Sequence, residues 1–226
     1  MTTDENQSLP PIQSLLIKPA GPDCNLACEY CFYRSKSALY PDTPRPRMSE
    51  QVLESMIRQY LALSGPQAAF GWQGGEPLLM GLDFFRKAVE FQKKYGKPGQ
   101  RVANGIQTNG VLLDDEWARF LRDYRFLVGL SLDGPPEMHD VYRQTANSRG
   151  SHAGVMDALK SLKRYNVEFN ALVVLNPVNV KQPERLYDYF LENQIYHLQF
   201  IPLAELDKTG KVASFSITAE QYGDFL

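Results

Sequence analysis

The sequence predicts an α/β fold built on a parallel sheet. Six short β-rich runs alternate with amphipathic helical stretches along nearly the whole chain. Clusters of Gly, Asn, Asp and Pro follow the carboxyl ends of several runs, which is the edge where parallel α/β folds bind ligands. The pattern favours a curved six-stranded sheet, either an open barrel or a doubly wound sheet.

The expected strands and helices follow one another in a regular order. In chain order, the strands are expected at 14–18, 68–73, 102–107, 126–132, 168–175 and 196–201. The helices between them are expected at 48–63, 83–95, 114–124, 153–165 and 183–192. In the first helix, apolar residues recur at helical spacing on one face: Val52, Leu53, Met56, Ile57, Tyr60 and Leu61. Ser64-Gly65-Pro66 ends that helix, and Asp114 is expected to cap the third.

The bulk composition indicates one soluble globular domain. The chain has 226 residues, of which 43% are hydrophobic and 22% charged, enough for a substantial core. A net charge of -2 gives no reason to expect a nucleic-acid partner or an anionic membrane surface. The polar, acidic amino terminus is not a signal peptide, and no run approaches the roughly 20 apolar residues that span a bilayer. A cytoplasmic, reducing location is therefore expected, and it suits free thiols.

All three cysteines lie within eight residues, at positions 24, 28 and 31. They are odd in number and too closely spaced for a disulfide framework. Three thiolates are also one too few for a closed four-ligand metal site. On a 4Fe–4S cluster, Cys24, Cys28 and Cys31 would leave one iron open to an exogenous ligand.

Two other interpretations of the cysteines stay open. One is a zinc site with a distant fourth ligand, although His139, His152 and His197 are all more than 100 residues away. The loop itself offers only the carboxylates of Asp23 and Glu29. The other interpretation is three ordinary free thiols.

The Cys-x-x-x-Cys-x-x-Cys spacing, with an aromatic residue before the last cysteine, resembles the signature of radical S-adenosylmethionine (SAM) enzymes. The resemblance implies a partial (β/α)6 TIM-like barrel of the radical SAM type. It also implies a 4Fe–4S cluster on the three cysteines and a SAM molecule that chelates the open iron. One-electron reduction of SAM then releases a 5′-deoxyadenosyl radical, so that the cofactors carry the difficult chemistry.

The strand-end motifs extend the resemblance to individual residues. Gln73, Gly74, Gly75 and Glu76 look like the family's Gly-Gly-Glu-Pro element, which holds the amine of SAM; by themselves they also fit a tight turn. Ser131 offers a hydroxyl for a carboxylate or ribose.

The remaining cofactor-binding assignments are less specific. Arg143 matches the family's Asp-x-x-Arg run and would bind a carboxylate, against the alternative of a solvated surface arginine. Tyr30 would border the adenine or shield the cluster from water. Three residues resemble cofactor- or substrate-pocket positions: Leu203, Asn109 and Asn176. His139 and His197 are expected to be structural.

The closer resemblance is to anaerobic sulfatase-maturating enzymes and their peptide-modifying relatives, over residues 18–202. It implies oxidation of a cysteine or serine side chain in a sulfatase, or in another peptide or protein, to Cα-formylglycine. It also implies an electron donor such as flavodoxin or ferredoxin. The alternatives are a different ribosomal-peptide substrate, and a truncated cluster-binding domain without turnover.

Members of that family also carry a C-terminal SPASM domain whose cysteines bind two auxiliary clusters. No cysteine follows Cys31 here, and the family's acid/base aspartate lies in the same C-terminal region. We therefore expect residues 1–226 to form a single radical SAM core, with the six βα units in about 13–203 and no SPASM domain. No catalytic acid or base is assigned.

Overall fold

The computed structural model describes residues 10–207 and 209–226 and contains one six-stranded, wholly parallel sheet. Its strands are β1 Ser14–Ile17, β2 Gln67–Trp72, β3 Arg101–Thr108, β4 Leu127–Ser131, β5 Phe169–Leu175 and β6 Leu198–Pro202. Each strand pairs only with its neighbours in sequence, in the order β1 to β6. A doubly wound sheet needs a point where the strand order reverses. That alternative is therefore wrong, and the open-barrel prediction is confirmed.

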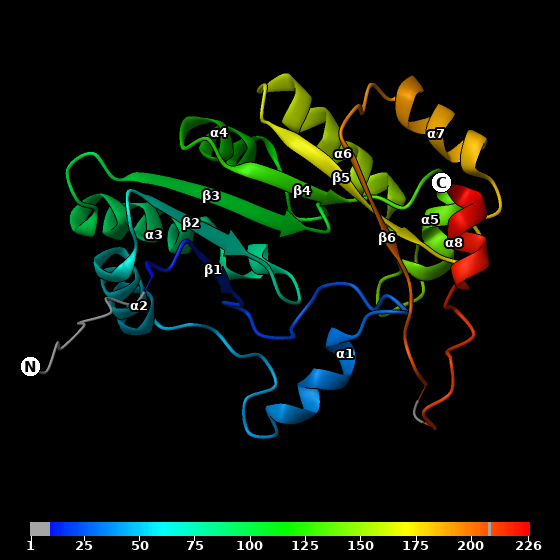
Figure 1. Cartoon of the computed structure of the whole chain (residues 1–226), viewed down its shortest axis with the longest axis horizontal. Coiled ribbons are helices and arrows are strands. Elements are labelled where there is room, and N and C mark those ends of the chain that lie inside the picture. The colour runs from blue at the N-terminus through cyan, green and yellow to red at the C-terminus, as the bar shows by residue number, and fades with distance from the viewer. Residues whose placement is uncertain (1–9, 208) are drawn as a thin grey trace, which may run out of the picture.

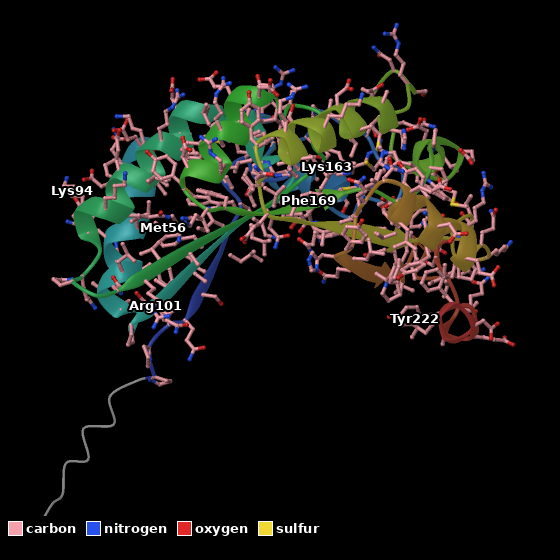
Figure 2. The ribbon with its side chains drawn as sticks, turned by 90° about the horizontal axis from the view of Figure 1, so that it is seen from above. Met56, Lys94, Arg101, Lys163, Phe169 and Tyr222 are labelled. Atoms are coloured by element: carbon pink, nitrogen blue, oxygen red, sulfur yellow. The ribbon has the colours of Figure 1, made fainter. Side chains whose placement is uncertain are left out.

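Most of the helices connect the strands and cover one side of the sheet (Figure 2). They are α1 Tyr33–Lys36, α2 Glu50–Leu63, α3 Leu82–Tyr95, α4 Asp115–Asp123, α5 Pro136–Tyr142, α6 His152–Arg164, α7 Pro183–Glu192 and α8 Ala219–Phe225, with 3₁₀ turns η1 Ser37–Leu39 and η2 Pro77–Met80. Figure 1 shows α1 beside the long loop that follows β1 and apart from α3, α4, α6 and α7. No helix in the described ranges is long and apolar enough to cross a membrane.

The five expected helices and six expected strands are all present, with ends shifted by at most two residues. Asp114 caps α4 as predicted, since its carboxylate accepts hydrogen bonds from the backbone N–H groups of Glu116 and Trp117. One core assignment is wrong. Val52 is exposed, because the buried stripe of α2 consists of Leu53, Ile57, Tyr60 and Leu61.

Three helices were not expected from the sequence. Helix α5 begins at Pro136, inside a Gly-Pro-Pro cluster that was interpreted only as a turn, although proline is favoured at the first helical position. Helix α8 carries a capping box, in which Thr218 and Gln221 each accept a hydrogen bond from the other's backbone N–H. Helix α1 is one turn long and leaves no periodic pattern to detect.

The main core lies between the sheet and the helices, and a smaller one lies at the carboxyl ends of the strands. Large side chains such as Phe70, Trp72 and Phe85 are fully buried in the main core. The second cluster joins Leu26, Cys28 and Tyr30 of the cysteine loop to Leu203, directly after β6. The cysteine loop follows β1 at one edge of the sheet and thus packs beside β6 at the opposite edge.

Candidate cluster and cofactor site

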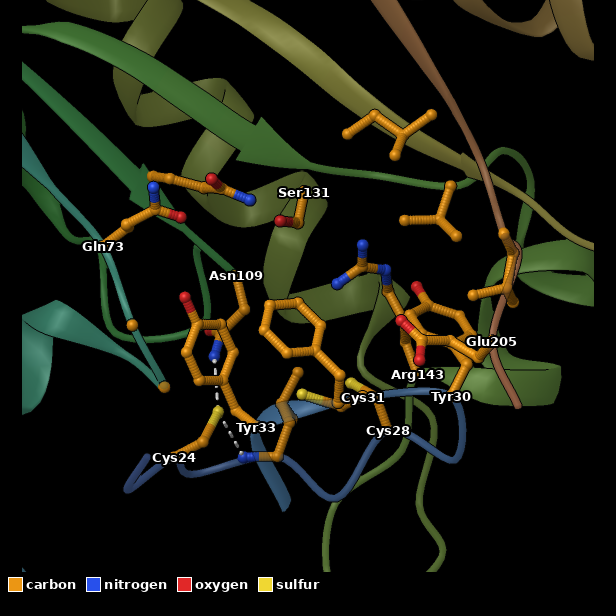
Figure 3. A pocket seen from close by; sticks show the side chains of 18 of the residues that line it. Cys24, Cys28, Tyr30, Cys31, Tyr33, Gln73, Asn109, Ser131, Arg143 and Glu205 are labelled. Carbon is orange, nitrogen blue, oxygen red and sulfur yellow. Dashed lines mark hydrogen bonds between the residues drawn. The ribbon is translucent and has the colours of Figure 1, made fainter. Parts of the chain in front are cut away.

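A cavity of about 250 Å³ opens at the carboxyl ends of the strands and is bordered by the cysteine loop. Figure 3 shows side chains from the loop, from the ends of β2, β3 and β4, and from the segment after β6 converging on it. Eleven of the thirteen residues predicted to bind the metal or to line the cofactor or substrate pocket border this cavity: Cys24, Cys28, Tyr30, Cys31, Gln73, Gly74, Gly75, Asn109, Ser131, Arg143 and Leu203. The exceptions are Glu76 and Asn176.

The turn after β2 supports the cysteine loop by direct backbone contact. The N–H groups of Gly75 and Glu76 donate to the carbonyl oxygens of Gly21 and Asp23, each at 2.8 Å. A Cβ atom on Gly75 would lie 1.9 Å from the Asp23 oxygen, and Gly74 has a φ of +132°. The absence of a side chain at Gly75 therefore lets the cysteine loop approach this turn, and the predicted binding of a cofactor by Gly74 and Gly75 stays a prediction.

The other side of the cysteine loop is tied to the chain that follows β4. Ala27 N–H donates to the carbonyl of Gln144 at 2.6 Å, and Glu29 N–H donates to that of Tyr142 at 3.0 Å. The loop is therefore held between two segments that are about 50 and 115 residues away in sequence, which fixes where its thiols lie.

The three thiols are free, and burial affects the ionisation of two of them. Cys28 is buried, whereas Cys24 and Cys31 are half-buried. Burial raises the pKa of Cys24 to about 12 and also raises the pKa of Cys28. The Cys24 sulfur accepts hydrogen bonds from Leu26 N–H at 3.4 Å and from Asn109 Nδ2 at 3.5 Å (Figure 3). The Cys24 and Cys28 thiols would therefore lose their protons on metal ligation and not before it.

The three thiols border the same cavity. Within the described residues, no three His, Cys, Asp or Glu side chains are grouped so that they could hold a metal ion. On a 4Fe–4S cluster each of the three thiolates would ligate a different iron. His139 is buried and hydrogen-bonded elsewhere, so it does not complete a zinc site.

Asp133, which was not predicted as a site residue, is a fully buried carboxylate beside the cavity. It accepts hydrogen bonds from Arg143 Nε at 2.8 Å and Nη2 at 3.2 Å, from the Tyr30 hydroxyl at 2.5 Å, and from Val174 N–H at 2.9 Å. Arg143 also lies over the Tyr30 ring, at 5.5 Å from its centroid. Asp133 therefore links the cysteine loop to the ends of β4 and β5.

Glu76 lies behind the cavity wall and is 1% exposed. Its carboxylate accepts hydrogen bonds from Leu78 N–H, Asn109 N–H and Thr108 Oγ1 at 2.8–2.9 Å. Burial raises the pKa of Glu76 to about 7, against the opposing effect of those three donors. In this structure Glu76 orders the turns after β2 and β3, and its binding of an ammonium group stays a prediction.

Other predicted residues divide between the cavity and the scaffold. Asn109 lines the cavity, whereas Asn176 is buried in the turn after β5 and accepts hydrogen bonds from Val178 and Asn179 N–H. His139 is structural: its Nδ1 accepts from Asp133 N–H, and burial lowers its pKa to about 3. Tyr33 and Glu205 also line the cavity and were missed. For Tyr33, its position two residues after Cys31 was an available signal.

Comparison with protein families gives a match to the radical SAM superfamily over residues 19–190. The chain belongs to this superfamily. Radical SAM proteins bind a 4Fe–4S cluster and SAM, and the three thiols that border one cavity agree with that assignment. The donor set and the backbone cradle around Cys24, Cys28 and Cys31 fit such a cluster.

Several radical SAM proteins resemble this chain closely. It is 42% identical over 228 residues to a serine-type anaerobic sulfatase-maturating enzyme of Bacteroides thetaiotaomicron, covering 94% of this chain and 55% of the relative. It is 41% identical to a cysteine-type enzyme of Clostridium perfringens, covering 96% and 59% respectively. The structure of anSMEcpe with bound AdoMet and the Cp18Cys peptide matches with a TM-score of 0.86 and 39% identity, over 95% of this chain and 58% of that one. The chain spans somewhat over half the length of these relatives.

Proposed function

We propose that this chain is a radical SAM core domain that reductively cleaves SAM and abstracts a hydrogen atom from a cysteine or serine side chain of a peptide or protein substrate. The best-supported process is anaerobic sulfatase maturation. The observation that carries the proposal is the cavity in which three cysteines meet Gln73 and Ser131 from the strand ends and Arg143 from the end of α5. Similarity to both serine-type and cysteine-type maturating enzymes supports the substrate class.

In this proposal Cys24, Cys28 and Cys31 ligate the cluster, and the open iron faces the cavity. When bound, the cluster and SAM supply one-electron reductive cleavage and a radical that removes hydrogen from the substrate. Ser131 and Arg143 offer donors for the carboxylate or ribose of SAM, and Glu76 lies behind the turn proposed to hold its amine. Tyr30 and Leu203 contribute to the wall around the adenosyl group.

The apolar lining of the cavity suits radical chemistry. Leu26, Phe32, Val174 and Leu203 line it beside the cysteines. Such side chains exclude water and offer no exchangeable proton to a reactive intermediate. Gln73 and Asn109 are polar groups at the ends of β2 and β3 that can orient the reacting atoms.

We further propose that residues of about 13–203 form the six βα units of one core domain, and that a protein such as flavodoxin or ferredoxin supplies the electron. The substrate is a sulfatase or another peptide or protein. A different ribosomal peptide is the alternative substrate, and a cluster-binding domain without turnover is the alternative function.

One experiment tests the cleavage step. The cluster is reconstituted without oxygen, dithionite and SAM are added, and 5′-deoxyadenosine is quantified. We expect nucleoside release from the unmodified chain and background from the Cys24→Ala variant, with iron content measured for both. If the unmodified chain is loaded with iron but releases no more 5′-deoxyadenosine than Cys24→Ala does, the enzymatic function is rejected and a non-turnover domain is favoured.

A second experiment tests the substrate. Peptides that carry a sulfatase maturation sequence with either Cys or Ser are offered to the same preparation, and each product is weighed by mass spectrometry. Deuterium placed at Cβ of the target residue should appear in 5′-deoxyadenosine. Nucleoside release without that transfer would point to another peptide substrate.

A further inference from the structure

The segment that follows the cysteine loop forms an exposed surface with an unusual composition. Between Lys18 and Arg47 there are five basic and three acidic side chains, although the whole chain has a net charge of -2. Among the described residues, only Arg47 of the basic side chains at 34–47 forms an ion pair, with Asp23 at 2.7 Å. Arg34, Lys36 and Arg45 thus have no ion-pair partner among the described residues.

Large apolar side chains are exposed within the same segment. Leu39 is 72% exposed, Phe32 52% and Tyr40 39%. We call Arg34, Lys36, Arg45 and these three residues the basic patch. Exposed apolar groups interspersed with cations are typical of a protein-docking surface, because the apolar groups gain by burial and the cations select an acidic partner.

The basic patch lies directly over the loop that carries the cysteines. Arg34 Nη1 donates to the carbonyl of Ala27 at 3.1 Å, between Cys24 and Cys28. Tyr40 and Pro46 both approach Gly21, within 4 Å of where its Cβ would lie, so the segment folds back on the start of the loop. Figure 1 shows α1 beside this loop, away from the helices that cover the sheet.

Most of the basic patch lies outside the cavity that a substrate must enter. Arg34, Lys36, Leu39, Tyr40 and Arg45 do not line the cavity, and Phe32 is the one member of the patch that does. A peptide whose side chain reacts must enter the cavity. A protein that only delivers an electron does not need to enter the cavity, but it must come close to the cluster. The basic patch lies on the outer side of the cysteine loop and allows such an approach.

We propose that the basic patch is the docking surface for a small acidic protein that donates single electrons to the cluster. The inference rests on the proposed function, because only a redox-active cluster needs such a donor. Electron-transfer complexes are weak, have small interfaces and depend on complementary charge to form quickly. The patch supplies that charge on the cluster side of an otherwise acidic chain.

The test compares two electron sources. Lys36→Glu/Arg45→Glu reverses two patch charges whose side chains have no hydrogen-bond or ion-pair partner in the described residues. Arg58→Glu/Arg101→Glu is the matched control; Arg58 lies on α2 and Arg101 begins β3, at the opposite end of the sheet. 5′-Deoxyadenosine formation is measured with dithionite and with a reduced acidic flavodoxin, at low and at high salt.

We expect the patch variant to lose about tenfold in flavodoxin-driven rate at low salt, with the loss shrinking as salt rises. The dithionite-driven rate of the patch variant should match that of the unmodified chain. The control variant should match the unmodified chain with both electron sources. An unchanged flavodoxin-driven rate, or an equal loss in the control, would overturn the proposal. If dithionite itself gives no nucleoside, the proposed function fails, and flavodoxin affinity measured by calorimetry then decides: equal affinities for the patch variant and the unmodified chain reject the docking surface.

Discussion

Arg143 and Asp133 form a forked ion pair beneath the cluster site, through Nε at 2.8 Å and Nη2 at 3.2 Å. Both side chains are almost completely buried, at 9% and 0% exposure. The sequence suggested that Arg143 would meet the carboxylate of a cofactor. The structure shows that a carboxylate of the protein already holds it in place, so Asp133 decides how the guanidinium faces the cavity.

Replacing Asp133 by Asn should strongly destabilise the chain. Arg143 would become a buried charge without its partner, a defect that costs about 3–5 kcal/mol. Urea unfolding of the cluster-free protein under anaerobic conditions measures it. Tyr30→Phe, which removes one donor to the same carboxylate, should cost about 1.5–3 kcal/mol. Equal, small effects of both changes would show that Asp133 is not the centre of the network.

Gly75→Ala should prevent the cysteine loop from docking. The new Cβ would lie 1.9 Å from the Asp23 carbonyl oxygen, so the loop must move and with it Cys24. We expect a lower melting temperature and substoichiometric iron after reconstitution. Gly223→Ala is the control, because nothing lies within 4 Å of a Cβ there. Normal iron loading by Gly75→Ala would contradict the supporting role of this turn.

Asn109→Ala should lower the reduction potential of the bound cluster. Hydrogen bonds to cluster sulfurs help to set that potential, and Asn109 Nδ2 lies 3.5 Å from the Cys24 sulfur. Removing the donor leaves more negative charge on the sulfur, which disfavours the reduced state. A redox titration followed by electron paramagnetic resonance measures the shift. An unchanged potential at full iron content would indicate that the side chain only orders Asn25, to which it donates at 2.8 Å.

The buried His139 should make stability depend on pH. Burial lowers its pKa from 6.5 to about 3, with Arg143 and His152 acting in the same direction and Asp133 against them. The unfolded chain therefore takes up a proton first, so stability is full above about pH 6.5 and falls as pH decreases towards 3. The slope is at most about 1.4 kcal/mol per pH unit.

His139→Asn is the variant that isolates this effect. It keeps an acceptor for Asp133 N–H but does not titrate in this range. Its unfolding free energy should be lower at neutral pH and should change less between pH 6.5 and 4 than that of the unmodified chain. Parallel curves for the two proteins would assign the acid sensitivity to other groups.

The order and type of the strands and main helices could be predicted from the sequence, because a strand or helix in this fold leaves a periodic apolar pattern or a terminal turn signal. The sequence also determined the three cysteines and the motifs at the strand ends. Parallel strands present their carboxyl ends at one edge of the sheet. The strand-end residues, of which Gln73 is the first and Leu203 the last, therefore had to lie close to one another.

The partner of each of these groups depends on how the whole chain folds. Asp133 could have been a turn cap, and Gly75 could have approached a ligand. Their roles depend on contacts with Arg143 and Asp23, across sequence separations that no local pattern records. Side-chain pairing across a sheet edge is fixed by packing of the whole chain, whereas element type is fixed by short-range periodicity.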